Sequence, residues 1–229
     1  MQRVAGRVPV IGGSGTNCTG ESLRKSLELQ KLGVDGLLII SPYYNKTNEE
    51  GMYHHLADVM DVVNVPCILY NIPGRTGCKI SPAVVERLSA HPNAWGIKEA
   101  SGDISYAASI AHCLSDDFRM MSGNDDMIVP LMSLGAVGVI SVWADVAPRT
   151  VHDLCAKFLA GDVAGARKLQ IDNLELIHSL FCEVNPIPVK AALAKMGLLD
   201  ENYRKPLWPM TDSDRERLYA AMKGAGLID

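Results

Sequence analysis

The chain has 229 residues and a formal net charge of −4, with no run of basic residues. This composition argues against a nucleic-acid partner or a charged membrane surface. Unbroken apolar stretches such as residues 37–40 are far shorter than the ~18 residues that a membrane-spanning helix needs. Residues 1–7 lack an apolar core, so we expect no signal peptide and a cytoplasmic protein.

Six cysteines are spread along the chain without any Cys-x-x-Cys pair. The adjacent histidines His54 and His55 point in different directions if they lie on a helix, so they do not form a metal-ligand pair. We therefore predict reduced thiols, no metal site and no cofactor.

Short apolar segments rich in β-formers recur along the first two thirds of the chain and are predicted to be strands. They are residues 8–11, 36–40, 66–70, 95–97, 119–122 and 137–142. Segments with helical periodicity alternate with them, at residues 23–32, 55–63, 82–88, 104–114, 125–134 and 148–159. From about Gly161 the strands cease, and residues 163–180, 186–199 and 212–223 are predicted helices, with Thr211 capping the last.

This alternation predicts an α/β fold with a parallel sheet covered by helices. Periodicity alone fits an open doubly wound sheet as well as an incomplete barrel. Tyr44, Tyr70, Lys98 and Gly123 all follow or end predicted strands, and a barrel gathers its active site at that edge. We therefore predict a (β/α)8 TIM barrel reduced to about six strand–helix units over residues 1–161, with a C-terminal helical region over residues 162–229.

Lys98 lies within Ala-Trp-Gly-Ile-Lys-Glu-Ala-Ser-Gly, at residues 94–102. A lysine inside a buried strand loses its proton more readily, and the neutral amine is the form that condenses with carbonyls. The alternative is a lysine at a strand end that points into solvent beside Glu99.

Tyr70 ends the preceding predicted strand, and Arg75 follows it in a loop bounded by glycines. The phenol can pass a proton to a bound intermediate, and the guanidinium can hold a carboxylate. Alternatively, the tyrosine only caps the strand and the arginine lies in water. The paired Tyr43 and Tyr44 suit an interface as well as a site.

The motifs Tyr-Asn-x-Pro-x-Arg-Thr-Gly at residues 70–77 and Gly-Ile-Lys-Glu-Ala-Ser-Gly at residues 96–102 together resemble the 4-hydroxy-tetrahydrodipicolinate synthase family. Further segments are similar to this family, namely residues 42–45, 122–125, 138–142 and 185–190. The resemblance implies a class I aldolase-type lyase of lysine and diaminopimelate biosynthesis. It also implies a homotetramer built as a dimer of dimers.

The resemblance implies that Lys98 forms a Schiff base with pyruvate, whose enamine attacks L-aspartate 4-semialdehyde. Tyr70 would shuttle protons, and Tyr44 would complete the relay across a dimer interface. Arg75 would hold the semialdehyde carboxylate, and Gly123 and Ile140 would line the pyruvate site. An L-lysine feedback site would involve Gly15, Asn17, Glu21 and Tyr43.

One part of the family pattern has no counterpart in the chain. Relatives carry two earlier strand–helix units with a Gly-Thr-Thr-Gly-Glu turn, and we expect roughly 60 residues of this kind to be absent. Two alternatives follow. One is a sibling aldolase, such as N-acetylneuraminate lyase or a 2-keto-3-deoxy sugar-acid aldolase, although Arg75 favours the synthase. The other is a catalytically inert assembly subunit.

Overall fold

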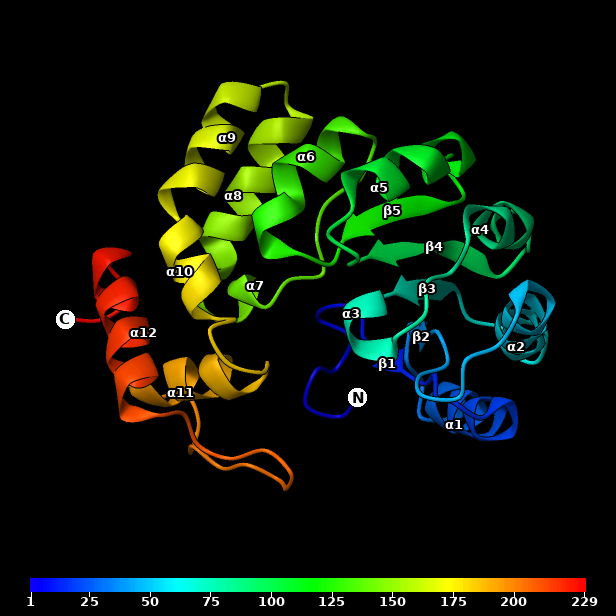
Figure 1. The fold of residues 1–229 in the computed structure, drawn as a ribbon, viewed down its shortest axis with the longest axis horizontal. Helices are drawn as coiled ribbons and strands as arrows, with labels where there is room; N and C mark the ends of the chain where they lie inside the picture. Colours follow the sequence, from blue (N-terminus) through cyan, green and yellow to red (C-terminus); the bar gives the residue numbers. More distant parts are fainter. The chain divides into compact units, whose positions relative to one another are not determined.

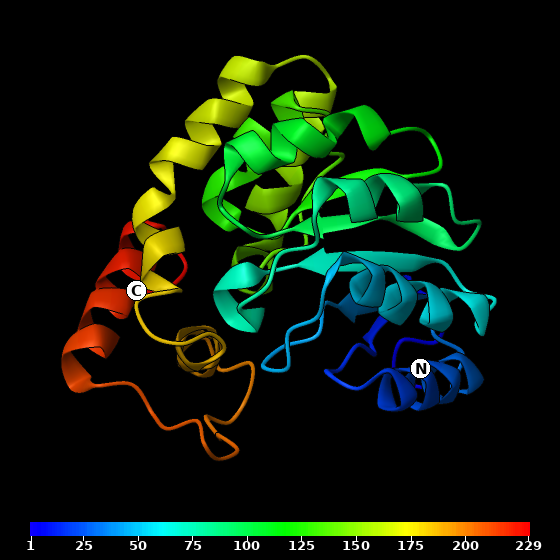
Figure 2. The same cartoon turned by 45° about the vertical axis from the view of Figure 1, so that its right-hand side comes forward.

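Five strands form one parallel sheet in chain order, β1-β2-β3-β4-β5; four lie where they were predicted, and the first lies at residues 11–13 instead of 8–11. The computed structural model describes residues 1–229. The strands are β1 (Ile11–Gly13), β2 (Gly36–Ile40), β3 (Cys67–Asn71), β4 (Ala94–Glu99) and β5 (Arg119–Ser122). At least one helix connects each strand to the next, as the βαβ pattern requires. Figures 1 and 2 show the strands side by side.

By its contacts the chain divides into two compact units. The first contains residues 1–124 and 130–138, and the second contains residues 125–129 and 139–229. The division into a barrel domain over residues 1–161 and a helical domain over residues 162–229 stays a prediction.

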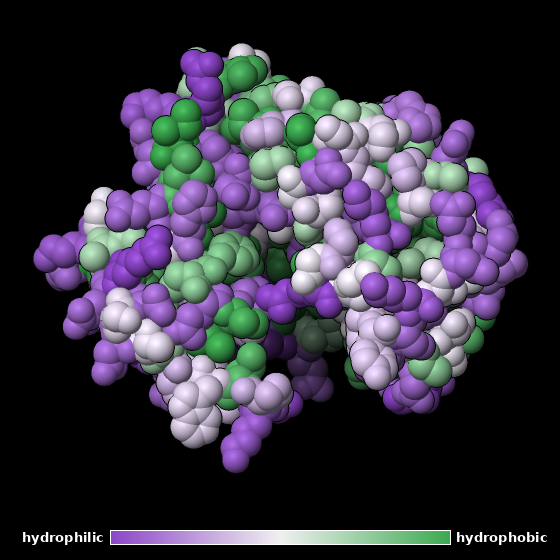
Figure 3. Space-filling view, in the orientation of Figure 1, coloured by the Kyte–Doolittle hydropathy of each residue, from purple (hydrophilic) through white to green (hydrophobic).

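Most helices of the first unit lie along one side of the sheet, and the short helix that follows β3 lies at the C-terminal end of that strand (Figure 1). They are α1 (Thr19–Lys31), α2 (Glu49–Asp61), α3 (Pro73–Thr76), α4 (Pro82–Ser89), α5 (Ile104–Ile110) and the 3₁₀ turn η1 (Ala111–Cys113). Side-chain caps begin three of them: the side chains of Asn48, Ser81 and Asp103 each accept a hydrogen bond from a backbone amide of the first turn. Hydrophilic side chains are frequent on the outer surface over α2 and α4 (Figure 3).

The two faces of this sheet differ in burial because successive side chains of a strand point to opposite faces. Leu37, Ile39, Leu69, Ile97 and Met120 are fully buried and form the core beneath the helices. The opposite face, called here the inner face, carries half-buried residues of the same strands, namely Leu38, Ile40, Tyr70 and Lys98. The inner face therefore holds Tyr70 and Lys98, whose polar groups can take part in a reaction.

The sixth predicted strand, residues 137–142, does not form as a strand of this sheet. Its first residues bond to β5: Val137 N donates to Met120 O at 2.8 Å, and Ser122 N donates to Gly138 O at 2.9 Å. Further along, the amides of Val142 and Trp143 donate to the Asp125 carboxylate instead, at 3.1 and 2.9 Å. These amides are thus already bonded to a side chain and make no strand ladder.

The second unit is helical apart from its loops. It contains η2 (Asp125–Met127), α7 (Trp143–Val146), α8 (Pro148–Leu159), α9 (Val163–Asp172), α10 (Leu174–Ser179), α11 (Ile187–Lys195) and α12 (Asp212–Gly224), while α6 (Ile128–Ser133) begins in this unit and ends in the first. Thr211 caps α12 by accepting from Asp214 N at 3.2 Å, as predicted. None of the helices is long and apolar enough to cross a membrane.

The single helix predicted for residues 163–180 is divided in two at Asn173. The side chain of Asn173 donates to Leu169 O at 2.9 Å, and its backbone angles, φ −107° and ψ 7°, leave the helical region. An asparagine that bonds locally to the backbone competes with helix continuation, which apolar periodicity does not reveal.

Candidate active site

Tyr70 and Lys98 are directly paired in the register of β3 and β4, one residue from the C-terminal end of each strand. Lys98 Nζ lies 4.4 Å from the centroid of the Tyr70 ring. Both side chains are half-buried on the inner face. The structure therefore brings together the two residues that the sequence singled out first, and Lys98 lies against a neighbouring ring rather than extending from the strand end.

Gly123 follows β5 and forms the wall beside the lysine. Its amide donates to Glu99 O at 2.7 Å. A Cβ at this position would lie 3.0 Å from Lys98 Cε and 2.5 Å from Ala100 Cβ. A side chain here would therefore displace the lysine stem, so glycine keeps the space next to the amine open.

The phenol of Tyr70 is held in its protonated form by its surroundings. Burial raises the pKa of Tyr70, and the positive charge of Arg75 lowers it in part. Arg75 lies in the last turn of α3 and is exposed. The arginine thus acts electrostatically on the phenol from the loop that follows β3.

Tyr44 does not pack within its own chain. It lies in the loop after β2, it is 91% exposed, and its backbone is left-handed with φ +69°. This conformation is uncommon for a residue other than glycine or asparagine. Tyr43 beside it is 39% exposed. Ile140 belongs to the second unit and is half-buried, so its role stays a prediction.

The residues of the predicted lysine site lie in the loop after β1 and the first turn of α1, with Tyr43 in the loop after β2. A Cβ on Gly15 would lie 2.4 Å from Ile40 N, so this loop runs tightly against β2. The carbonyl of Asn17 accepts from Asn45 Nδ2 at 2.9 Å, which ties the two loops together. The Glu21 carboxylate is paired with Arg24 at 2.8 Å on the surface.

Sequence reasoning missed one buried polar cluster behind the site. Asn71 and Glu99 follow Tyr70 and Lys98 directly, and their side chains are 0% and 2% exposed. Asn71 Nδ2 donates to Glu99 Oε2 at 2.7 Å. A polar residue that ends an apolar strand one position after a candidate was the signal that could have revealed it.

Comparison with known proteins settles the family. A family model described as the dihydrodipicolinate synthetase family matches residues 1–225. The chain belongs to this family. The 4-hydroxy-tetrahydrodipicolinate synthase of Pelobacter propionicus is 45% identical over 228 residues, which cover 100% of this chain and 79% of that protein.

Solved structures of the dihydrodipicolinate synthetase family agree with this. The chloride-inhibited dihydrodipicolinate synthase of Acinetobacter baumannii, in complex with pyruvate, has a TM-score of 0.95 and 41% identity, over 99% of this chain and 78% of that one. The enzyme of Cyanidioschyzon merolae with lysine bound has a TM-score of 0.93 and 36% identity, over 96% and 75% of the two chains. The predicted family, the barrel fold with a C-terminal helical region, and the class I aldolase-type lyase are confirmed.

Proposed function

We propose that the chain condenses pyruvate with L-aspartate 4-semialdehyde through a Schiff base on Lys98, as a 4-hydroxy-tetrahydrodipicolinate synthase of lysine and diaminopimelate biosynthesis. One observation carries the proposal. The Lys98 amine lies 4.4 Å from the Tyr70 ring centroid at the C-terminal ends of two paired parallel strands. This is the edge at which barrels of this class place their chemistry.

Lys98 supplies the nucleophile for the first step. Its neutral amine attacks the C2 carbonyl of pyruvate, and the resulting carbinolamine loses water to give the imine. The leaving hydroxyl needs a proton, and Tyr70 is the proposed donor, because its ring lies beside the Lys98 amine and burial raises the pKa of its phenol. A phenol that is still protonated at neutral pH can donate that proton and later recover it.

The second step forms the new carbon–carbon bond. Loss of a proton from C3 of the imine gives an enamine, which attacks the aldehyde carbon of the second substrate. Arg75 is exposed in α3, which follows β3, and its planar guanidinium suits the carboxylate of that substrate. Release of the product then regenerates the lysine amine.

A second copy of the chain completes the site in this proposal. Tyr44 is 91% exposed, and its backbone is in the left-handed conformation. A tyrosine so placed suits a partner's site better than its own. The proposed assembly is a cytoplasmic homotetramer in which pairs of subunits exchange Tyr44.

L-lysine is proposed as a feedback inhibitor at the loops after β1 and β2. The relative from Cyanidioschyzon merolae was solved with lysine bound. In this chain Glu21 offers a carboxylate and Asn17 lies in the loop tied to Asn45. A ligand ammonium at Glu21 would compete with Arg24, which now holds that carboxylate.

Borohydride trapping tests the proposed Schiff base. The protein is incubated with pyruvate, reduced with borohydride, and examined by mass spectrometry of the intact chain and its peptides. The expected result is one reduced pyruvate adduct, located on Lys98. The absence of any adduct contradicts the proposal and favours the inert subunit, and an adduct on another lysine removes Lys98 as the nucleophile.

Matched variants make the trapping specific. Lys98→Arg should form no adduct, because a guanidinium stays protonated. Lys157→Arg, which changes an exposed lysine of α8, should form the adduct as the unmodified chain does. A product assay with L-aspartate 4-semialdehyde against sialic acid then separates the synthase from the sibling aldolases.

A further inference from the structure

A second residue pair lies directly behind the Tyr70–Lys98 pair, on the opposite face of the same two strands. Asn71 and Glu99 are partners in the register of β3 and β4, just as Tyr70 and Lys98 are. Their side chains point toward the helices, whereas Tyr70 and Lys98 point to the inner face. The two pairs therefore share one backbone segment at the end of each strand.

Glu99 is surrounded by hydrogen-bond donors. Oε2 accepts from Asn71 Nδ2 at 2.7 Å, and Oε1 accepts from Ser101 N at 2.7 Å and from Ser101 Oγ. The carboxyl is 2% exposed, and burial raises the pKa of Glu99 while these bonds lower it in part. A buried carboxyl is costly unless it is fully bonded, so these contacts fix its position strongly.

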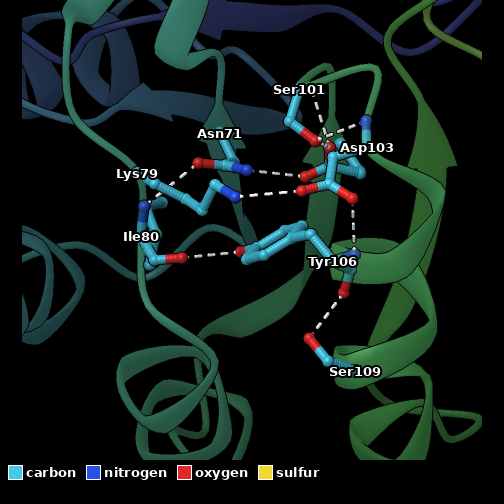
Figure 4. A network of polar contacts seen from close by, with 8 residues as sticks. Asn71, Lys79, Ile80, Ser101, Asp103, Tyr106 and Ser109 are labelled. Atoms are coloured by element: carbon cyan, nitrogen blue, oxygen red, sulfur yellow. Dashed lines mark hydrogen bonds and ion pairs between the residues drawn. The ribbon is translucent and has the colours of Figure 1, made fainter.

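Asn71 extends the contacts into the loop before α4. Its Oδ1 accepts from Ile80 N at 3.0 Å, and Ile80 O accepts from the Tyr106 hydroxyl at 2.7 Å. Figure 4 shows the chain of contacts from Asn71 through Ile80 to Tyr106 of α5. Lys79 and Asp103 form an ion pair at 3.2 Å beside this chain of contacts.

The backbone ties the same two residues to the site. Ala100 N donates to Asn71 O at 2.9 Å, and Gly123 N donates to Glu99 O at 2.7 Å. The ends of β3, β4 and β5 are thus joined through Asn71 and Glu99. A displacement of either residue would move the Cα of Lys98 or Tyr70, each of which is its direct chain neighbour.

We propose that Asn71 and Glu99 form a positioning pair, whose buried side-chain hydrogen bond holds Lys98 and Tyr70 in the geometry needed for imine formation. The inference deepens the proposed function, and rests on it, by adding two residues that touch no substrate. Catalytic groups must be held within a fraction of an ångström, and a misplacement of about 1 Å costs about 100-fold in rate.

The hydrogen bond runs from the Asn71 amide to the Glu99 carboxylate, and variants that reverse its direction test the positioning role. In Glu99→Gln, the new amide NH₂ group faces either the Asn71 Nδ2 donor or the donors of Ser101. In both orientations two hydrogen-bond donors oppose each other. Asn71→Asp places a carboxylate against the Glu99 carboxylate. The double variant Asn71→Asp with Glu99→Gln reverses the bond: the new amide donates to the new carboxylate, while Ile80 N keeps an acceptor and net charge is unchanged.

The measured quantity is the initial rate of borohydride-trapped pyruvate adduct, at a temperature where circular dichroism shows each variant folded. Each single variant should be slower by about tenfold to 100-fold, and the double variant should recover to within about threefold of the unmodified chain. Glu50→Gln, the same change in an exposed pair with Arg87, should leave the rate unaltered. Single variants as fast as the unmodified chain, or a double variant no faster than the singles, overturn the positioning role.

Two further measurements test the positioning role if a single variant does not fold or if the unmodified chain forms no adduct. If a single variant does not fold, Ser101→Ala removes only one donor to Glu99 and should still slow adduct formation, and an unaltered rate then overturns the role. If the unmodified chain forms no adduct, the proposed function fails by itself. The positioning role of Asn71 and Glu99 is then tested by the rate of trace acetylation of Lys98 relative to Lys157. An acetylation rate of Lys98 that changes in the single variants and is restored in the double variant supports the role. An unchanged acetylation rate overturns it.

Discussion

The Gly123 amide donates a 2.7 Å hydrogen bond to the carbonyl of Glu99, which brings the chain after β5 against the residue that follows Lys98. This contact sets how close the backbone of Gly123 lies to the lysine stem. Glycine leaves the amine accessible, and the same bond fixes the end of β4. This contact therefore contributes both to the shape of the site beside Lys98 and to the position of the lysine.

Gly123→Ala should slow pyruvate adduct formation by at least about tenfold, because its Cβ would meet Lys98 Cε at 3.0 Å and Ala100 Cβ at 2.5 Å. Overpacking of this kind also lowers the free energy of unfolding by about 1–3 kcal/mol. Trapping rates and urea denaturation measure the two effects. Gly20→Ala is the control, because nothing lies within 4 Å of its added Cβ, and an equal loss of rate there would refute the steric explanation.

Tyr70→Phe should lower the rate of imine formation by about 100-fold or more, because it removes the proton donor and leaves the ring in place. Burial raises the pKa of Tyr70, so the phenol loses its proton only above its ordinary value of about 10. The alkaline limb of the pH–rate profile that belongs to this group should lie above that value and be absent in the Phe variant. A profile identical in shape for both chains would remove Tyr70 from the proton transfer.

Arg75→Ala should weaken use of the aldehyde substrate far more than formation of the pyruvate adduct, because the proposed ligand of Arg75 is the semialdehyde carboxylate. The loss of its charge also removes the influence that lowers the Tyr70 pKa, so the alkaline limb should move to higher pH. Steady-state kinetics with each substrate varied in turn measure the first effect. Equal losses for both substrates would contradict the carboxylate role.

Glu21→Gln should weaken binding of L-lysine by about tenfold, because the proposed site loses the carboxylate that pairs with a ligand ammonium. Glu21 lies outside the Tyr70–Lys98 pair, so adduct formation in the absence of lysine should be unchanged. Titration calorimetry with L-lysine measures the affinity. Lysine binding of equal strength in both chains would place the inhibitor elsewhere.

Glu201→Gln should lower the free energy of unfolding at neutral pH by about 1–2 kcal/mol. Arg215 holds this carboxylate with two hydrogen bonds of 2.6 and 2.7 Å, and the arginine lowers the pKa of Glu201 from its ordinary value of 4.5. A lowered pKa stabilises the fold above that value, and this contribution is lost as the pH falls through the folded-state pKa. The difference from the unmodified chain should therefore shrink below about pH 4.5 in urea denaturation.

The exposed ion pair between Lys168 and Asp172 is the control for the partly buried pair between Glu201 and Arg215. Its side chains are 74% and 49% exposed, and such surface pairs contribute little. Asp172→Asn should change stability by less than about 0.5 kcal/mol at every pH. A pH-dependent loss as large as that of Glu201→Gln would contradict the burial argument.

The sequence by itself determined most strands and helices of this protein and the identity of its candidate groups. Apolar strands that alternate with amphipathic helices, and Thr211 as a helix cap, are local signals, because each depends only on neighbours along the chain. Tyr70 and Lys98 were recognisable because each lies close to the carboxyl end of a strand, and parallel strands bring these ends to one edge.

Only the tertiary structure decided the remaining features, because each depends on groups distant in sequence. Residues 137–142 begin beside β5, with Val137 and Gly138 bonded to its backbone, but the Asp125 carboxylate takes the amides of Val142 and Trp143, which ends the pairing by Val142. The Asn71–Glu99 pair joins residues 28 apart, and a hydrogen bond of that kind follows from strand register rather than from composition. The space beside Lys98 likewise exists only because Gly123 packs against the neighbouring strand.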